Sequence, residues 1–390
     1  MIIYHDKDIT QKTILKAIND KIQENARLIK MQNYYKGKQS ISERFYEDET
    51  KPNNRICINY CKEIADFFTN YLVGVPLVYE NMPPKIIDTL KYNDDDEVLL
   101  QAVKQMNING FSCELFYTDE QGNVRYASLN PLECIIFCQD DLQGDIKAFI
   151  RLIKNDEETG GYTAIYYTDT YYQSFMVDDV TSQLSPISDE VHHFFNDVPI
   201  NLYKNNDELQ GTFEQIISLQ DGLNKLMSDN INEIEQFADS YLVLKGLNAT
   251  KNEDISEMKR NRVLLLDSDS GAEWLTKSVN TQHVKQLQDD LKYFIKQNSF
   301  LPDFDVLGNG IVLQSGEALK TKLILTEIQA NGQQRAITKA IQRKFELLYN
   351  IYSLSEKLGD YTDITFKFER VILPDIKVYS LPDADDEFTP

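Results

Sequence analysis

Residues 301–330 read LPDFDVLGNGIVLQSGEALKTKLILTEIQA and join two segments with helical periodicity. Pro302 ends the first helical pattern, and the glycines within 308–310 allow a flexible turn. The apolar spacing that follows predicts a long helix over 315–358. This stretch therefore predicts a loop with an apolar tip, Ile-Val-Leu at 311–313, held between two helices.

The composition predicts a folded, acidic protein. The 390 residues are 42% hydrophobic, enough for two or three domains or layers, and 62 acidic residues against 40 basic ones give a net charge of -22. Such a charge disfavours tight binding of nucleic acid, although DNA could pass without adhering. There is no 18-residue apolar run and no signal-peptide pattern, and the five cysteines suggest no disulfide framework, so we expect a cytoplasmic location and no membrane span.

The first half of the chain alternates helical and strand patterns. Amphipathic spacing predicts helices over 8–35, 55–73 and 83–106, with the acidic run at 93–97 as a solvated turn and a mobile polar loop between the first two helices. From residue 111 the period changes to two, and turn sequences such as DEQGN separate about six strands that end near residue 179. We expect these strands to form one antiparallel meander, followed by an extended connector.

Helical patterns dominate the second half. Residues 211–240 predict one helix whose polar face carries six acids against Lys225 alone. A solvated helix usually mixes charges of both signs, so this face resembles a negative wall, although acids can also serve solubility alone. A small αβ insert follows over 241–280, then a return helix over 282–298, the long helix with a kink at Asn331 and Gly332, and a closing strand.

The sequence holds few signatures of catalysis. It lacks a P-loop, a dinucleotide-binding glycine motif, a nucleophile elbow and a zinc-protease HExxH motif, so we predict no enzyme activity, cofactor or metal. The adjacent His192 and His193 favour surface or packing roles. The cysteine pairs spaced four apart could suggest zinc, but their apolar neighbours favour buried thiols. The DSDSG turn at 267–271 favours a plain hairpin over a calcium loop.

Four stretches in matching order resemble the portal proteins of long-tailed phages of Gram-positive hosts. They begin at Tyr34 (YYKGK), Lys51 (KPNNRICINYCKEIADFFTNYLVGVP), Gly211 (GTFEQIISLQDGLNKLMSDNINEIEQFADSYLVLKG) and Ser315 (SGEALKTKL). The resemblance implies an α+β portal fold in a ring, normally a dodecamer, at one capsid vertex of the virion. Double-stranded DNA is packaged and ejected through its centre.

The resemblance also implies a domain plan. Residues 1–210 and 315–358 would form the wing, 211–240 and 281–300 the stem helices, 241–280 the clip, 301–314 the tunnel loop, and 359–390 a closing strand with a short or truncated crown. Partners would be the terminase packaging motor, the head-completion adaptor, and capsid and scaffold proteins. A helical scaffold or adaptor without DNA passage is the alternative.

Three sets of candidate functional residues follow. The predicted channel-lining acids are Glu214, Asp221, Asp229, Glu233 and Glu235. The tunnel-loop residues implied by the resemblance are Val306, Leu307, Gly308, Asn309, Gly310, Ile311, Val312, Leu313 and Gln314. The implied clip residues that contact an adaptor are Asp267, Asp269, Glu273 and Trp274.

Overall fold

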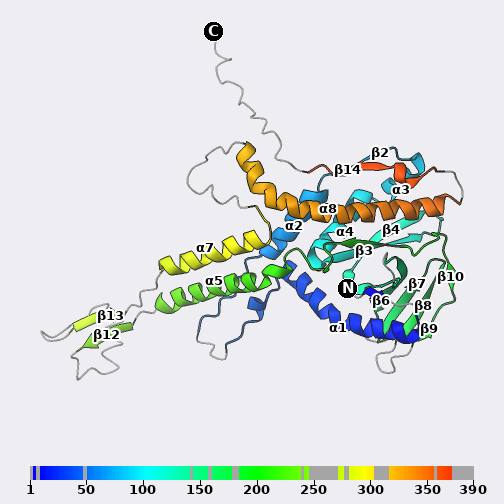
Figure 1. Cartoon of the computed structure of the whole chain (residues 1–390). Helices are drawn as coiled ribbons and strands as arrows, with labels where there is room; N and C mark the ends of the chain where they lie inside the picture. Colours follow the sequence, from blue (N-terminus) through cyan, green and yellow to red (C-terminus); the bar gives the residue numbers. More distant parts are fainter. Residues whose placement is uncertain are drawn as a thin grey trace, which may run out of the picture. The chain divides into compact units, whose positions relative to one another are not determined.

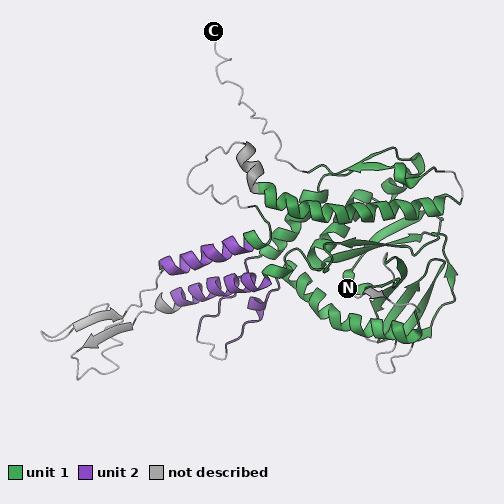
Figure 2. Cartoon of the chain, in the orientation of Figure 1, with its two compact units in different colours: residues 1–37, 59–216, 296–390 green, residues 38–58, 217–295 purple. Residues whose placement is uncertain are grey.

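A computed structural model describes residues 3–5, 9–46, 51–140, 144–156, 160–177, 184–238, 241–245, 271–275, 281–302, 316–354 and 358–370. For the strands at 3–5, 241–245 and 271–275 the backbone alone is described. The chain divides into two compact units (Figure 2). Unit 1 comprises residues 1–37, 59–216 and 296–390, and unit 2 comprises residues 38–58 and 217–295.

Unit 1 begins with strand β1 (Ile3–His5) and helix α1 (Gln11–Tyr35) (Figure 1). Thr10 caps α1, because its side chain accepts a hydrogen bond from the Thr13 backbone N–H at 3.2 Å. The isoleucines that give this helix its amphipathic spacing are not all buried, since Ile18 is buried but Ile22 and Ile29 are exposed. The buried face instead includes a lysine, and its members are Ala17, Ile18, Lys21, Leu28, Met31 and Tyr34.

Helix α2 (Tyr60–Val73) begins five residues later than predicted. Asn59 caps it by accepting from the Lys62 backbone N–H at 3.1 Å, while residues 51–58 are not helical. Strand β2 (Val78–Glu80) and helices α3 (Pro84–Tyr92) and α4 (Asp95–Asn109) follow. The break between α3 and α4 lies where predicted, but it is not a solvated turn, because Asn93 and Asp95 are buried.

The six predicted strands exist, but they belong to two sheets. Strands β3 (Phe111–Thr118) and β4 (Val124–Leu129) pair with each other, and β11 (Ile200–Lys204), which lies in the predicted connector, pairs with β3. The short 3₁₀ helix Pro131–Glu133 then carries the chain into a second, seven-stranded sheet of order β1-β5-β6-β7-β8-β10, with β9 also paired to β8. Its remaining strands are β5 (Cys134–Cys138), β6 (Ile146–Lys154), β7 (Tyr162–Tyr167), β8 (Tyr171–Val177), β9 (Leu184–Pro186) and β10 (Val191–His192).

Successive side chains along these strands point to opposite faces of their sheet, so each sheet packs against a different layer of unit 1 on each face. In β5, Ile136 packs toward the three-stranded sheet, whereas its neighbour Ile135 packs toward Ile18 of α1. In β3, Leu115 faces the seven-stranded sheet, and Phe116 faces a helical layer that includes α4 and α8. The order of layers is therefore α1, the larger sheet, the smaller sheet and the helices. A strand buried on both faces reads as a continuous apolar run, as CIIFC does in β5.

Helix α8 (Gly316–Tyr352) is the longest element and continues through Asn331 and Gly332 without a break. It ends six residues before the predicted end. Its buried face includes Ile337, Ile341 and Phe345. After the 3₁₀ turn Tyr361–Asp363, strand β14 (Thr365–Lys367) pairs with β2, so the predicted closing strand is present although shorter.

Unit 2 contains helix α5 (Ile217–Ala238) and the two-stranded antiparallel sheet of β12 (Tyr241–Lys245) and β13 (Gly271–Leu275). It also contains helix α7 (Thr281–Asn298), whose last residues belong to unit 1. The helix predicted over 211–240 begins only at Ile217, because Glu214–Ile216 form a separate 3₁₀ turn in unit 1. The short 3₁₀ helix Ser40–Glu43 also belongs to unit 2.

Candidate functional site

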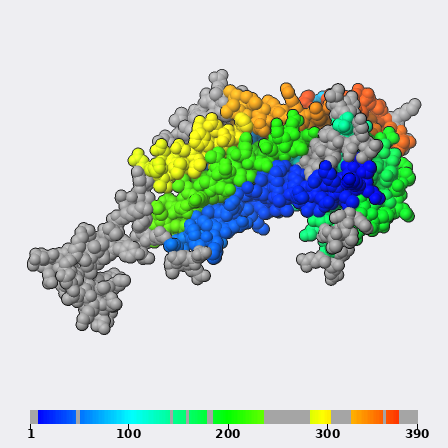
Figure 3. Space-filling view, turned by 60° about the horizontal axis from the view of Figure 1, so that its bottom comes forward, coloured from blue at the N-terminus to red at the C-terminus, as the bar shows by residue number. Residues whose placement is uncertain are grey.

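Helix α5 lies between α7 and the segment 38–58 (Figure 3). The helix packs closely on α7 at Gly222, where an added Cβ would lie 3.9 Å from a methyl carbon of Leu291. β12 follows the end of α5 and pairs with β13, which precedes the start of α7, and the two helices run antiparallel (Figure 1). The paired strands β12 and β13 lie between them in the sequence, so the order of elements is the helix, insert and return helix predicted for 211–298.

The segment 54–58 runs along α5 as an extended chain and bonds to it through alternate backbone N–H groups. The N–H of Ile58 donates to Asn224 Oδ1 at 2.9 Å, that of Ile56 to Ser228 Oγ at 2.9 Å, and that of Asn54 to Asn232 Oδ1 at 2.8 Å. Two residues of extended chain advance about 6.7 Å and four residues of helix about 6 Å, so the two repeats match. We call this set of bonds the strap ladder.

The strap ladder explains why sequence patterns misassigned this region. Apolar spacing from residue 55 mimicked a helix, and the polar composition before it suggested a mobile loop. Instead Gln39 and Ile41 are buried, and Arg44 donates to Asp229 Oδ1 at 2.6 Å. The signal that could have revealed the ladder is the spacing of Asn224, Ser228 and Asn232, which places three small polar side chains on one stripe of α5.

Several predicted channel-lining acids have partners within their own chain. Glu214 lies in the 3₁₀ turn of unit 1, where Arg27 Nη1 contacts both of its carboxylate oxygens, at 2.6 and 2.8 Å. Asp229 pairs with Arg44, and Asp221 Oδ2 accepts from Ser40 Oγ at 3.3 Å. Glu235 Oε2 accepts from Asn54 Nδ2 at 2.8 Å. Arginines therefore balance the charges of Glu214 and Asp229. All of the predicted acids except Glu214 lie on α5.

The other two predicted sets lie partly or wholly outside the described residues. Val306 to Gln314, the tunnel-loop set, are all outside them, as are Asp267 and Asp269 of the clip set. The backbone of β13 places Glu273 opposite Val243 and Trp274 opposite Leu242. At the end of α7, the Phe300 carbonyl accepts from Thr326 Oγ1 of α8 at 2.7 Å, so the chain is anchored just before residue 303.

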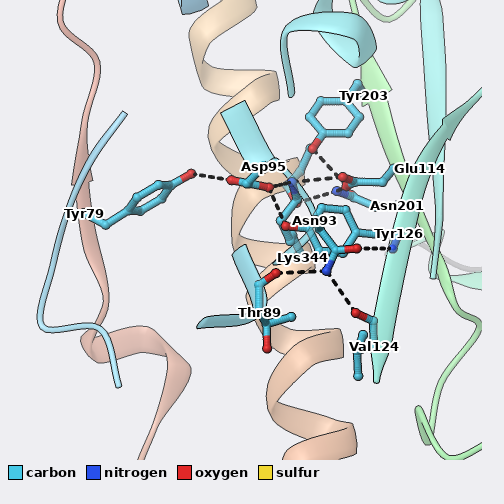
Figure 4. Close-up of polar contacts among 11 residues, drawn as sticks. Tyr79, Thr89, Asn93, Asp95, Glu114, Val124, Tyr126, Asn201, Tyr203 and Lys344 are labelled. Carbon is cyan, nitrogen blue, oxygen red and sulfur yellow. Dashed lines mark hydrogen bonds and ion pairs between the residues drawn. The ribbon is translucent and has the colours of Figure 1, made fainter. Parts of the chain in front are cut away.

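Unit 1 also contains a group of buried charges that no sequence pattern indicated (Figure 4). Lys344 of α8 is 1% exposed, and its Nζ lies 2.6 Å from Asp95 Oδ1 and 2.9 Å from Glu114 Oε1. Tyr126 donates to Asp95 Oδ1 at 2.8 Å, and Tyr203 donates to Glu114 Oε2 at 3.1 Å. This buried charge cluster joins α8, α4, β3, β4 and β11.

The electrostatics of the cluster favour a charged lysine. Burial alone lowers the pKa of Lys344, but the adjacent Asp95 and Glu114 carboxylates outweigh it and raise that pKa well above its usual value. Burial also raises the pKa of Tyr126 and Tyr203, so both phenols stay protonated and donate. One cation between two carboxylates, with phenol donors around them, meets the conditions under which buried charges are tolerated.

A second buried polar group connects the helices of unit 1. Gln333 Nε2 of α8 donates to Asn107 Oδ1 of α4 at 2.8 Å. Asn107 Nδ2 in turn donates to Thr69 Oγ1 of α2 at 3.0 Å, and Thr212 Oγ1 donates to Asn107 Oδ1 at 2.7 Å. These bonds fix the register of three helices against the turn that precedes residue 214.

The described residues offer little for catalysis or metal binding. No group of three or more His, Cys, Asp or Glu that could hold a metal ion occurs among them. His193 Nε2 lies 2.9 Å from the Thr168 carbonyl, and burial lowers the pKa of that imidazole. Of the five cysteines, Cys57 alone is exposed. Within the described part of the chain, no helix is both long and apolar enough to cross a membrane.

Comparisons with known proteins fit this architecture. The curated portal protein of Bacillus phage SPP1 is 24% identical over 347 residues, which are 83% of this chain and 68% of that protein. Two solved structures share the fold, the neck of an empty GTA particle computed with C6 symmetry and the neck of a native GTA particle computed with C12 symmetry. For each, the TM-score is 0.51 and the identity 12%, over 80% of this chain and 81% of the other.

The family assignment rests on a match over nearly the whole chain. The model of the family described as "Phage portal protein, SPP1 Gp6-like" matches residues 14–378, a range that includes unit 2, the layered core of unit 1 and both buried polar groups. Portal proteins are a structural class, and the match favours a portal over the alternative of a helical scaffold or adaptor without DNA passage. The chain belongs to the SPP1 Gp6-like phage portal proteins, which form the portal at a capsid vertex.

Proposed function

We propose that twelve copies of this chain form a ring whose central channel carries double-stranded DNA into and out of the capsid. The observation that carries this proposal is the antiparallel pair of α5 and α7 in unit 2, with the paired strands β12 and β13 between them in the sequence. Such a pair has polar faces that a neighbouring copy and a channel could share. The C12 symmetry of a neck with the same fold supports the subunit number.

We assign α5 and α7 to the stem of the ring and residues 241–280 to the clip. Residues 301–314 would be the tunnel loop, and 1–210 together with 315–358 the wing. The strap ladder suggests one refinement. Residues 38–58 cluster with α5 in unit 2, so we place them with the stem instead of the wing.

The α5 acids would provide a channel surface that does not hold DNA. Affinity for the DNA backbone comes from basic side chains that replace condensed counterions. A wall of carboxylates provides no such replacement, so duplex can slide along it. The acids of α5, namely Asp221, Asp229, Glu233 and Glu235, would form this wall. Arg44 partly balances the charge of Asp229, and Glu214 lies outside α5 and pairs with Arg27.

The clip would dock the terminase motor during packaging and the head-completion adaptor afterwards. Asp267, Asp269, Glu273 and Trp274 are the proposed contact residues, because a Trp among acids can anchor an interface whose rim is charged. ATP hydrolysis would belong to the motor, since this chain has no P-loop and its family is structural. We infer that the portal itself has no enzymatic activity.

Charge reversal tests the channel wall. The triple variant Asp221→Lys, Glu233→Lys, Glu235→Lys should assemble rings but retard packaging, because its new cations would bind passing phosphates. The control is Asp88→Lys, which changes an exposed acid of α3 in unit 1. Packaged DNA per particle, measured by complementation of a portal-deficient phage, gives the readout. Normal packaging by the triple variant with intact rings would overturn the proposed wall.

A further inference from the structure

Strand β4 is an outer strand of the three-stranded sheet, with β3 on one side only. Leu115 of β3 is opposite Ala127 of β4, and the N–H of Phe116 points the other way, to the Pro199 carbonyl at 2.9 Å. Backbone groups alternate in direction along a strand. The N–H and C=O of Tyr126 and Ser128 therefore point away from β3, toward the open edge.

One part of that edge is already closed by a side chain that imitates a neighbouring strand. Asn93 Oδ1 accepts from the Tyr126 N–H at 3.2 Å, and Asn93 Nδ2 donates to the Val124 carbonyl at 2.9 Å. Further along, the outward N–H of Ser128 has no hydrogen-bond acceptor among the residues that the structure describes. The edge is thus covered at 124–126 and open at 128.

A surface pocket of about 500 Å³ lies at the open part of the edge. Leu100 and Ile108 of α4 and Leu129 of β4 give it an apolar component. Amides from α1 and α4 are also present among its lining residues, which include Gln32, Gln101 and Gln105. The pocket therefore combines the features that an added strand needs, namely free backbone groups, an apolar surface and polar groups beside it.

The pocket is positively charged, which is unusual for so acidic a chain. Lys36 and Lys104 line it, and neither forms an ion pair within the described residues. The Lys104 Nζ lies 5.2 Å from the centre of the Tyr35 ring, a cation–π contact that orients the ammonium group. Glu97 is the one carboxylate among the lining residues, and its Oε1 accepts from Gln101 Nε2 at 2.8 Å.

We propose that this pocket, the β4-edge site, binds an extended carboxylate-bearing segment of a partner protein as a fourth strand. The segment would bond to the N–H and C=O of Ser128, and its carboxylate would pair with Lys104. A peptide fits this arrangement better than a phosphate backbone, because the edge offers acceptors as well as donors. The site lies within unit 1 of a single chain and requires neither a ring nor DNA.

A defined probe tests the site on the full chain. The peptide Ac-TEVETEVT-NH2, labelled for fluorescence anisotropy, should bind, and the version with Gln at each Glu should bind about tenfold more weakly, the loss of roughly one charge-assisted hydrogen bond. Lys104→Gln should weaken binding of the acidic peptide by a similar factor. Lys12→Gln, which changes an exposed lysine of α1 outside the pocket, should leave binding unchanged. Methylation of alternate peptide nitrogens should abolish binding, because it blocks a strand ladder.

Three results would overturn the proposal. The first is that the N-methylated peptide binds as tightly as the unmodified peptide, or that the Lys104→Gln variant binds the acidic peptide as tightly as the unaltered protein does. Either result would indicate nonspecific attraction. The second is no binding at millimolar peptide, either to the full chain or to a chain that ends at residue 370. The third is binding that begins only after residues 371–390 are removed. That segment is acidic at 383–387, so this result would make it the occupant in place of a partner.

Discussion

Replacing Lys344 with methionine would remove the one cation of the buried charge cluster while keeping much of the side-chain volume. Asp95 and Glu114 would then lie 6% and 0% exposed without a counter-charge. Each has contacts that hold it in place, from Tyr126 and Tyr203 respectively, so neither carboxylate can turn to water without breaking a hydrogen bond. The variant therefore tests whether α8 is fastened to the smaller sheet by charge.

The expected cost is large. Removing one partner of a buried ion pair typically costs about 3–5 kcal/mol, and two carboxylates share this lysine, so we expect the upper part of that range. At about 2–4 °C per kcal/mol for a large domain, the melting temperature should fall by roughly 10 °C or more. Because the pKa of Lys344 is raised above 10.5, the pairing is fully present below about pH 10 and is lost only as pH rises through that raised value. The fall in melting temperature caused by Lys344→Met should thus be the same at pH 7 and pH 9.

Thermal unfolding at matched protein concentration, followed by circular dichroism, measures this effect. Lys339→Met is the control, since it removes an exposed lysine of the same helix and should change stability by no more than about 0.5 kcal/mol. The triple variant Lys344→Met, Asp95→Asn, Glu114→Gln should recover part of the loss, because no buried charge then lacks a partner. If Lys344→Met and Lys339→Met have the same melting temperature, the buried charge cluster does not hold α8 against the smaller sheet by charge, and the prediction is wrong.

Three further predictions follow from other contacts. Ser228→Ala removes the acceptor of the Ile56 N–H, a loss of about 1 kcal/mol. Hydrogen exchange of the Ile56 amide should therefore become about fivefold to tenfold faster. An unchanged exchange rate would refute the strap ladder. Gly110→Ala should destabilise the protein by several kcal/mol, because Gly110 has a φ of +90° and an added Cβ would lie 1.9 Å from the Leu209 carbonyl oxygen. The control Gly122→Ala, at a φ of +79° in open space, should cost only about 1 kcal/mol. Equal melting temperatures of the two variants would contradict this prediction. Burial lowers the pKa of His193, so the unfolded chain binds more protons near pH 6, and the stability of the folded protein should fall as pH drops through 6.5. In melting curves recorded below pH 7, His193→Gln should reduce this dependence of stability on pH. An unchanged dependence would assign it to other groups.

The sequence was sufficient where local periodicity decides the structure. Helices α1, α4, α7 and α8 and the strands β3 to β8 lie close to their predicted positions, because burial on one face imposes a regular spacing of apolar residues. The match to portal proteins, carried by four stretches in order, was confirmed by the family model. Those stretches include Asn54, Asn224 and Ser228 of the strap ladder, although their bonds could not be read from them.

The sequence was insufficient where distant residues decide. The acidic run at 93–97 has the composition of a solvated turn, yet Asp95 is buried because Lys344, 249 residues later, pairs with it. Likewise, nothing near residue 55 shows that its neighbours will bond to side chains about 170 residues away instead of forming a helix. The acids of α5 could be counted from the sequence, but their pairing with Arg44, Ser40 and Asn54 could not.

The central claim is that copies of this chain form a ring with a central channel. Cryo-electron microscopy of the purified full chain, with class averages viewed along the particle axis, tests it most directly. We predict rotationally symmetric rings with twelve subunits and a central hole wide enough for duplex DNA. Compact particles without a hole, or monomers at concentrations where capsid proteins assemble, would contradict the account.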